Sequence, residues 1–275
     1  MNAHAQNLNP CFAFSGLGHT GSAGAPARKD QTIIISEGKI QALGDASATP
    51  VPAGAKVMEM RDYTVIPGLV GMHDHIFYPA GPGHYNTLAF SAPRLYLACG
   101  VTTIRTTGSM EPFTELNLKK AINLGRIPGP KMHGTSPYLE GSGAFTIQMR
   151  ELAVPEDARK MVQYWTDQGI DDCKVYINIT KDELAAAIDE VHKRGMKVSG
   201  YLCSIGFRET AALGIDNLEH GLLVDSETSA KSSYSSRQVS LRLRPLRSRL
   251  TTARSIWASW IGSAPWRPAS RRTWC

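Results

Sequence analysis

The stretch VIPGLVGMHDHIFYP, residues Val65–Pro79, ends an apolar run with two histidines one residue apart. In a strand, side chains two residues apart lie on the same face, so His73 and His75 are expected to project together. Two neutral imidazoles at that spacing can bind one divalent ion. The same pattern also fits two polar residues that end a strand and bind nothing. A metal site therefore requires further ligands elsewhere in the chain.

Strand patterns and helix patterns alternate downstream of these histidines. Six apolar stretches between residues 64 and 224 are separated by segments with helical spacing of apolar residues, and the six read TVIPGLVG, VTTIRTTG, KMHGTSP, DDCKVYI, MKVSGYL and IDNLEHGLLV. This alternation is typical of βαβ units that build a parallel sheet. In such folds the site residues lie where strands end and the following loops begin.

The residues before this region predict a small β unit. QTIIISEGKIQALG, residues 31–44, has a β-branched run, a Glu37–Gly38 turn and a second short strand, which is the pattern of a β-hairpin. AKVMEMRDYTVIPG adds one or two more strands. Residues 1–22 show no periodicity, and we assign them no structure.

Composition excludes some classes of protein. The chain has 275 residues, 42% of them hydrophobic and 20% charged, and no apolar run approaches the ~20 residues that span a bilayer. A globular protein without a membrane span is therefore expected. The five cysteines are widely spaced and form no CxxC pair, which predicts reduced thiols and a cytoplasmic location. The sequence does not indicate the oligomeric state.

Positive charge is concentrated at the C-terminal end. Residues Thr228–Cys275 contain ten of the thirty Lys and Arg residues, no Asp or Glu, and four of the five tryptophans. We predict a disordered basic tail for residues 228–275. Binding of nucleic acid through this tail is an alternative function, because cations neutralise phosphates and aromatic rings stack on bases. No recognisable nucleic-acid-binding module accompanies the tail, which argues against that alternative.

Two further residues could carry chemistry. Lys174 lies inside the apolar stretch DDCKVYI, where a lysine is costly unless it is neutral, paired or modified, or unless it extends to the rim of the sheet. Tyr176, two residues on, would share its face. His220 closes the stretch GIDNLEHG, and strand alternation would point Glu219 away from it, as a structural partner rather than a ligand.

The segment VIPGLVGMHDH resembles the first-strand motif of the amidohydrolase superfamily of metal-dependent hydrolases. The paired histidines and the later strand motifs occur in the order found in that family. The resemblance is nearest to its imidazolonepropionase-like and prolidase-like enzymes. The resemblance covers about residues 24–227. It implies an α/β fold: an incomplete (β/α)8 TIM-type barrel of about six of eight units, with part of a small N-terminal β-sandwich. The expected organisation is an atypical leader (1–22), a partial β-sandwich (23–66), a partial barrel with the metal site (67–227) and the basic tail (228–275).

The resemblance also implies a site and a reaction. One or two divalent ions, with zinc expected, would activate water to hydrolyse a carbon–nitrogen bond in a cyclic amide or a dipeptide-like substrate. The implied metal ligands are His73, His75, Lys174 (carboxylated in many family members) and His220. By position, the residues expected to line the pocket for this small-molecule substrate are Tyr176, Tyr201 and His84.

Two departures from the family pattern bear on activity. In KVSGYLCS, Tyr201 occupies the position of an expected metal-binding histidine, with Gly200 or Leu202 as the equivalent if the register shifts. No acid follows Glu227, so the aspartate expected on the eighth barrel strand is absent and no catalytic residue is assigned. We expect impaired hydrolysis, with an inactive remnant as the alternative. Truncation or a frameshift after about residue 227 would explain the change in composition.

Overall fold

The computed structural model describes residues 11–19 and 26–220, which divide into two compact units. The first unit contains the described residues up to Ile76, together with Leu88–Thr106 and Asn117–His133. The second contains Phe77–Thr87, Thr107–Leu116 and the described residues from Gly134 onward. The predicted basic tail, residues 228–275, lies outside the described residues, as does most of the predicted leader.

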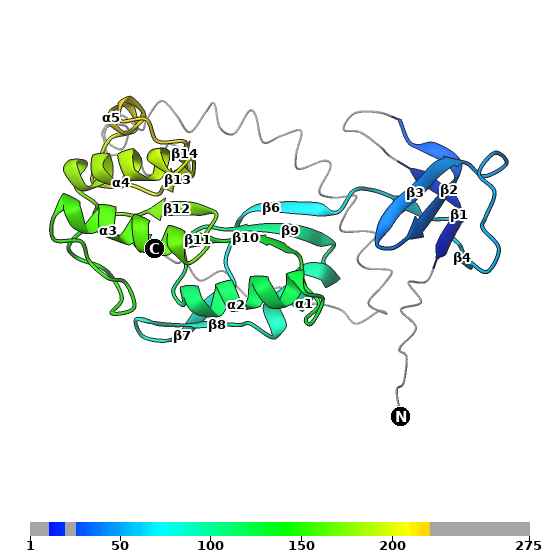
Figure 1. The fold of residues 1–275 in the computed structure, drawn as a ribbon, viewed down its shortest axis with the longest axis horizontal. Coiled ribbons are helices and arrows are strands. Elements are labelled where there is room, and N and C mark those ends of the chain that lie inside the picture. Colours follow the sequence, from blue (N-terminus) through cyan, green and yellow to red (C-terminus); the bar gives the residue numbers. More distant parts are fainter. Residues whose placement is uncertain (1–10, 20–25, 221–275) are drawn as a thin grey trace, which may run out of the picture. The chain divides into compact units, whose positions relative to one another are not determined.

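An N-terminal sheet forms part of the first unit (Figure 1). Its strands run in the order β3-β2-β1-β4, with β5 pairing β1: β1 (Phe12–His19), β2 (Arg28–Ser36), β3 (Lys39–Asp45), β4 (Lys56–Glu59) and β5 (Thr64–Val65). The predicted hairpin of β2 and β3 is confirmed. Its turn residues Glu37 and Gly38 both have positive φ, as a type I′ hairpin turn requires.

Strand β1 corrects the expectation that residues 1–22 have no structure. Phe12–His19 pairs antiparallel with β2 and parallel with β4, so it has a strand partner on each side. Ala13 is fully buried there, opposite Ile34. The segment FAFSGLGH contains two glycines and no regular alternation, so its strand conformation depends on pairing with segments distant in the sequence.

The first unit also contains a three-stranded parallel sheet in the order β10-β9-β6. Its strands are β6 (Leu69–Asp74), β9 (Val101–Thr106) and β10 (Lys131–His133), and the helices that accompany them are α1 (Ser91–Ala98) and the later part of α2 (Pro112–Asn123). Five buried residues form the core of this region: Ile76, Ala92, Ile104, Leu118 and Met132. Its strand–helix–strand order confirms the predicted alternation.

The second unit continues this alternation in a four-stranded parallel sheet whose spatial order follows the chain order. Its strands are β11 (Thr135–Leu139), β12 (Asp172–Val175), β13 (Lys197–Gly200) and β14 (Asn217–Leu218); its helices are α3 (Pro155–Asp167), α4 (Lys181–Lys193) and α5 (Phe207–Ala212). Figure 1 shows α3 and α4 side by side along these strands. The unit also contains a hairpin of β7 (Phe77–Gly81) and β8 (His84–Thr87).

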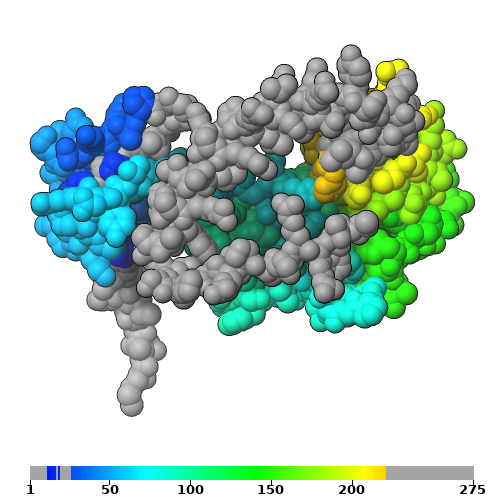
Figure 2. Space-filling model, turned by 180° about the vertical axis from the view of Figure 1, so that it is seen from behind, coloured from blue at the N-terminus to red at the C-terminus, as the bar shows by residue number. Residues whose placement is uncertain are grey.

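Local sequence explains where the long helices of this unit begin. Helix α4 starts at a capping box, in which the Thr180 side chain accepts a hydrogen bond from the Glu183 amide and the Glu183 carboxylate accepts one from the Thr180 amide. Helix α3 starts with Pro155, followed by two acidic residues that suit the positive end of the helix. The green to yellow residues of this unit form one continuous body in the space-filling view (Figure 2).

Two predictions from composition can be compared with the described residues. None of the helices among them has both the length and the apolar character needed to cross a membrane. The cysteines in this part of the chain are all free thiols: Cys11, Cys99, Cys173 and Cys203. The whole is an α/β fold with parallel and antiparallel strands.

Candidate functional site

The two histidines of the opening stretch lie together at the end of β6. His73 is in the strand and His75 follows it, and their rings contact edge to face with centroids 5.3 Å apart. The Tyr96 hydroxyl donates a hydrogen bond to the carbonyl oxygen of His75, at 2.9 Å. Ile76, the next residue, is fully buried in the core. These contacts fix the strand end, so the two imidazoles are held close to each other.

Lys174 lies in the interior of the second unit. Strand β12 pairs with β11 on one side and β13 on the other, and only 1% of the Lys174 surface is exposed. Its ammonium group forms an ion pair with the carboxylate of Glu219, which is also buried. The alternative in which Lys174 extends to the rim of the sheet is therefore wrong. A buried lysine is tolerated here because it is paired with an opposite charge.

Lys174, Glu219 and His220 form one cluster, although strand alternation predicted that Glu219 points away from His220. A carboxylate oxygen of Glu219 and a ring nitrogen of His220 lie within 4.8 Å of each other. The cause is the backbone of His220, whose φ of 65° is in the left-handed region and breaks the strand alternation. The ion pair with Lys174 is a structural contact of the kind expected for Glu219.

The environment of His220 favours its neutral form. Burial lowers the pKa of its imidazole, and the positive charge of Lys174 lowers it further. The neutral imidazole is the form that binds metal ions. A non-glycine residue in a sparsely populated backbone conformation is also a feature that clusters at functional sites.

A chain of aromatic rings runs from His220 through the second unit. The Tyr201 ring lies 4.5 Å from the His220 ring and 5.4 Å from the Tyr176 ring, and Tyr176 lies 4.5 Å from Tyr138. Burial raises the pKa of all three tyrosines, so each phenol keeps its proton at neutral pH. Tyr176 and Tyr201, both predicted to line the pocket, are thus in direct contact with each other.

The structure also distinguishes the three positions considered for the missing histidine. A side chain at Gly200 would point at Ile215, Val175 and Leu202, and Leu202 itself is fully buried in the core. Tyr201 alone of the three has its ring against His220.

Two other histidines stand apart from this cluster. His84 is exposed at the start of β8, where the β7–β8 hairpin turns. His192 lies 2.9 Å from the carboxylate of Asp216 and links α4 to the segment before β14. The described contacts therefore do not bring His84 to the Lys174–Glu219–His220 cluster.

Glu140 is a buried acid that sequence reasoning missed. It is fully buried at the end of β11, and its Oε1 accepts hydrogen bonds from the backbone N–H groups of Gly141 (2.9 Å) and Asn178 (2.6 Å). It thereby joins the loops that follow β11 and β12. Gly141 permits this approach, because a Cβ there would lie only 2.1 Å from the Asn178 carbonyl oxygen. Burial raises the pKa of Glu140, and the two hydrogen bonds oppose that rise.

We expect Glu140→Ala to lower the free energy of unfolding by about 1–3 kcal/mol, because it leaves buried amide donors unsatisfied. Glu140→Gln keeps an acceptor and should retain most of the stability. Since the folded-state pKa is raised, the stability that Glu140 contributes is present at acid pH and is lost as the pH rises through that pKa. Urea unfolding at pH 5 and pH 8 should show the glutamine variant gaining on the wild type at pH 8. An equal difference at both pH values would contradict this prediction.

The donor types in each unit are ones that a divalent metal ion takes. In the first unit His73 and His75 offer imidazole nitrogens, and in the second unit His220 offers an imidazole nitrogen and Glu219 carboxylate oxygens. Lys174 is an ammonium group paired with Glu219 and has no lone pair to donate in that form. It can act as a ligand only after it loses a proton, either as a neutral amine or as a carbamate.

Comparison with known proteins points to one class of enzyme. No protein-family model matches the chain. An enamidase from Eubacterium barkeri is 25% identical over 176 residues, which cover 54% of this chain and 45% of that enzyme. Among solved structures, a proposed prolidase from Bifidobacterium longum matches with a TM-score of 0.66 and 26% identity, covering 80% of this chain and 56% of that one.

A Xaa-Pro dipeptidase with bound methionine matches with a TM-score of 0.63 and 20% identity, over 79% of this chain and 63% of that one. These neighbours are hydrolases of the amidohydrolase superfamily, which confirms the resemblance predicted from the sequence. The chain spans about half the length of the enamidase and of the proposed prolidase.

Proposed function

We propose that this chain is a metal-dependent hydrolase of carbon–nitrogen bonds that acts on cyclic amides or dipeptide-like substrates. The observation that carries the proposal is the buried Lys174–Glu219 pair beside His220, in a fold similar to that of amidohydrolases. The neighbours named enamidase, prolidase and Xaa-Pro dipeptidase support a carbon–nitrogen bond as the target. In this proposal the parallel strands belong to a partial (β/α)8 barrel, and the N-terminal sheet belongs to a small β-sandwich.

The proposed metal ligands are His73, His75, Lys174 as a carbamate, and His220, with zinc as the metal. A bound divalent ion would lower the pKa of a water molecule and polarise the carbonyl group of the substrate. Neutral His220 is ready to bind without first losing a proton, because burial lowers the pKa of its imidazole. Before carboxylation, Glu219 holds the Lys174 side chain in place through their ion pair. As a carbamate, Lys174 would carry a negative charge, and the bound metal ion would then balance the charges of both groups.

The tyrosines have a separate role in this proposal. Because burial raises their pKa values, Tyr176 and Tyr201 keep their protons on the phenol oxygens and can donate hydrogen bonds. Donors aimed at the carbonyl oxygen would stabilise the negative charge that develops there during hydrolysis. The rings would also exclude water from the apolar part of the substrate.

Metal content tests the proposal. The chain is loaded with zinc, passed through a desalting column and analysed by mass spectrometry for metal. We expect bound zinc in the wild type and at least about tenfold less in the double variant His73→Ala/His75→Ala, because two imidazole ligands are lost. His192→Asn is the matched control, since that ring pairs with Asp216. A wild type without zinc, or equal zinc in all three proteins, would refute the proposed centre. A screen of dipeptides and cyclic amides then tests turnover.

A further inference from the structure

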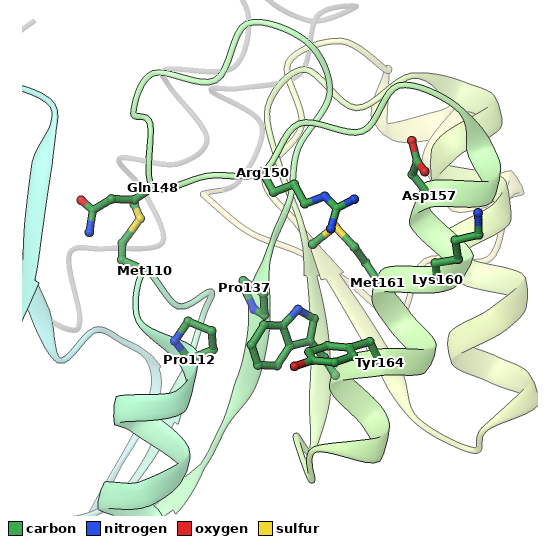
Figure 3. Close-up of a pocket in the computed structure, with 10 residues that line it drawn as sticks. Met110, Pro112, Pro137, Gln148, Arg150, Asp157, Lys160, Met161 and Tyr164 are labelled. Atoms are coloured by element: carbon green, nitrogen blue, oxygen red, sulfur yellow. The ribbon is translucent and has the colours of Figure 1, made fainter.

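A second candidate binding site lies entirely within the second unit. A cavity of about 620 Å³ opens between the start of α2 and the face of α3, and Figure 3 shows the side chains gathered around it. Lys160 and Asp157 approach from α3, while Met110 and Gln148 lie on the opposite side. The cavity has the volume of a small-molecule site. It shares no residue with the Lys174–Glu219–His220 cluster.

Aromatic and thioether side chains form the apolar part of this cavity. The Trp165 ring packs against the hydrophobic core of the second unit. Its centroid lies 5.1 Å from that of the Phe113 ring and 5.0 Å from that of the Tyr164 ring, so neighbouring rings hold it in place. Met110 and Met161 are buried beside it. A fixed indole with polarisable neighbours is a surface on which a planar ring can stack at little entropic cost.

Two cations line the same cavity, and no described carboxylate pairs with either of them. Within the described part of the chain, neither Arg150 nor Lys160 forms an ion pair. Other cations of α3 and α4 are paired, as in the contact of Arg159 with Asp189. One acid, Asp157, also lines the cavity, and its Oδ2 accepts a hydrogen bond from the Ala153 amide. Among the described residues, the charged lining therefore sums to one positive charge.

We propose that this cavity binds a small aromatic carboxylate. The aromatic ring lies against Trp165, and the carboxylate contacts Arg150 and Lys160. The guanidinium group of Arg150 matches a carboxylate with two parallel N–H donors, and Lys160 adds a second positive charge. A single net positive charge suits a monoanion better than a doubly charged phosphate, because Asp157 repels additional negative charge. The site is independent of the proposed hydrolase centre.

Calorimetric titration of the full chain with 1-naphthoate tests the proposal, with 1-naphthamide and acetate as probes that lack the charge or the ring. We expect naphthoate to bind and acetate to give no signal. The affinity for naphthamide should be lower than that for naphthoate by a factor of about ten or more. Arg150→Gln and Lys160→Gln should each weaken naphthoate binding about tenfold, whereas Asp157→Asn should tighten it. Arg208→Gln, an exposed arginine of α5 outside the cavity, is the matched control and should bind as the wild type does.

Equal binding of naphthoate and naphthamide would overturn the proposal, as would equal losses in Arg150→Gln and Arg208→Gln. The titration is repeated after treatment with a chelator and in His73→Ala/His75→Ala, because a carboxylate could also bind a metal ion. Binding that survives both treatments and is weakened by Arg150→Gln supports the cavity. Binding that disappears with the metal and survives Arg150→Gln places the ligand elsewhere and overturns the proposal.

Discussion

Replacing Lys174 with methionine is expected to lower the free energy of unfolding by about 3–5 kcal/mol. Methionine fills a similar volume but removes the ammonium group that faces Glu219. The Glu219 carboxylate then stays buried without an opposing charge, and the desolvation of that charge is the main cost. Urea unfolding monitored by circular dichroism, in the presence of a chelator, measures the effect without a contribution from bound metal.

A double variant separates the charge from the packing at this position. Lys174→Met/Glu219→Gln removes both charges and should recover most of the stability that Lys174→Met loses, because no uncompensated charge remains. Lys193→Met is the matched control, since Lys193 forms an exposed pair with Asp189 within α4 and should change stability by at most about 1 kcal/mol. If Lys174→Met is as stable as Lys193→Met, the buried ion pair does not stabilise the second unit.

Tyr201→His is expected to increase zinc affinity at least about tenfold, or about 1.4 kcal/mol. The Tyr201 ring already contacts the His220 ring at 4.5 Å, so an imidazole at this position offers a second nitrogen beside the first. A protonated phenol is a poor metal ligand at neutral pH, and burial raises the pKa of Tyr201 further. Competition with a fluorescent zinc chelator measures the affinities of wild type and variant side by side.

Tyr201→Phe is the control for this experiment. It keeps the ring and removes the hydroxyl group, so it should leave zinc affinity close to that of the wild type. Equal affinities of the histidine and phenylalanine variants would show that position 201 does not face the metal.

Local patterns were sufficient to predict the secondary structure of the region around the candidate site. The apolar stretch that contains Lys174 is a strand, as is the segment that contains His73, and the helical spacing of residues 181–193 became α4. Each of these signals lies within a short segment, because burial of one face imposes a period of two or 3.6 residues. The resemblance to amidohydrolases rested on the same short segments.

Features that depend on distant segments were not predicted. Strand β1 has a weak local pattern and forms because β2 and β4 pair with it on both sides. The β7–β8 hairpin is tied to a later loop by the Gln148 side chain, which exchanges hydrogen bonds with the Tyr85 backbone. The cavity beside Trp165 depends on the approach of α2, β11 and α3, whose side chains are far apart in the sequence.

The sequence by itself determined the alternation of strands and helices, the pairing of His73 with His75, and the class of enzyme that the chain resembles. Tertiary structure decided which partner neutralises Lys174, where Glu219 lies relative to His220, and that Tyr201 contacts His220. The physical reason is that periodicity records which face of an element is buried. The identity of a charged partner, and the positive φ of His220 that turns its side chain, depend on how separate strands pack together.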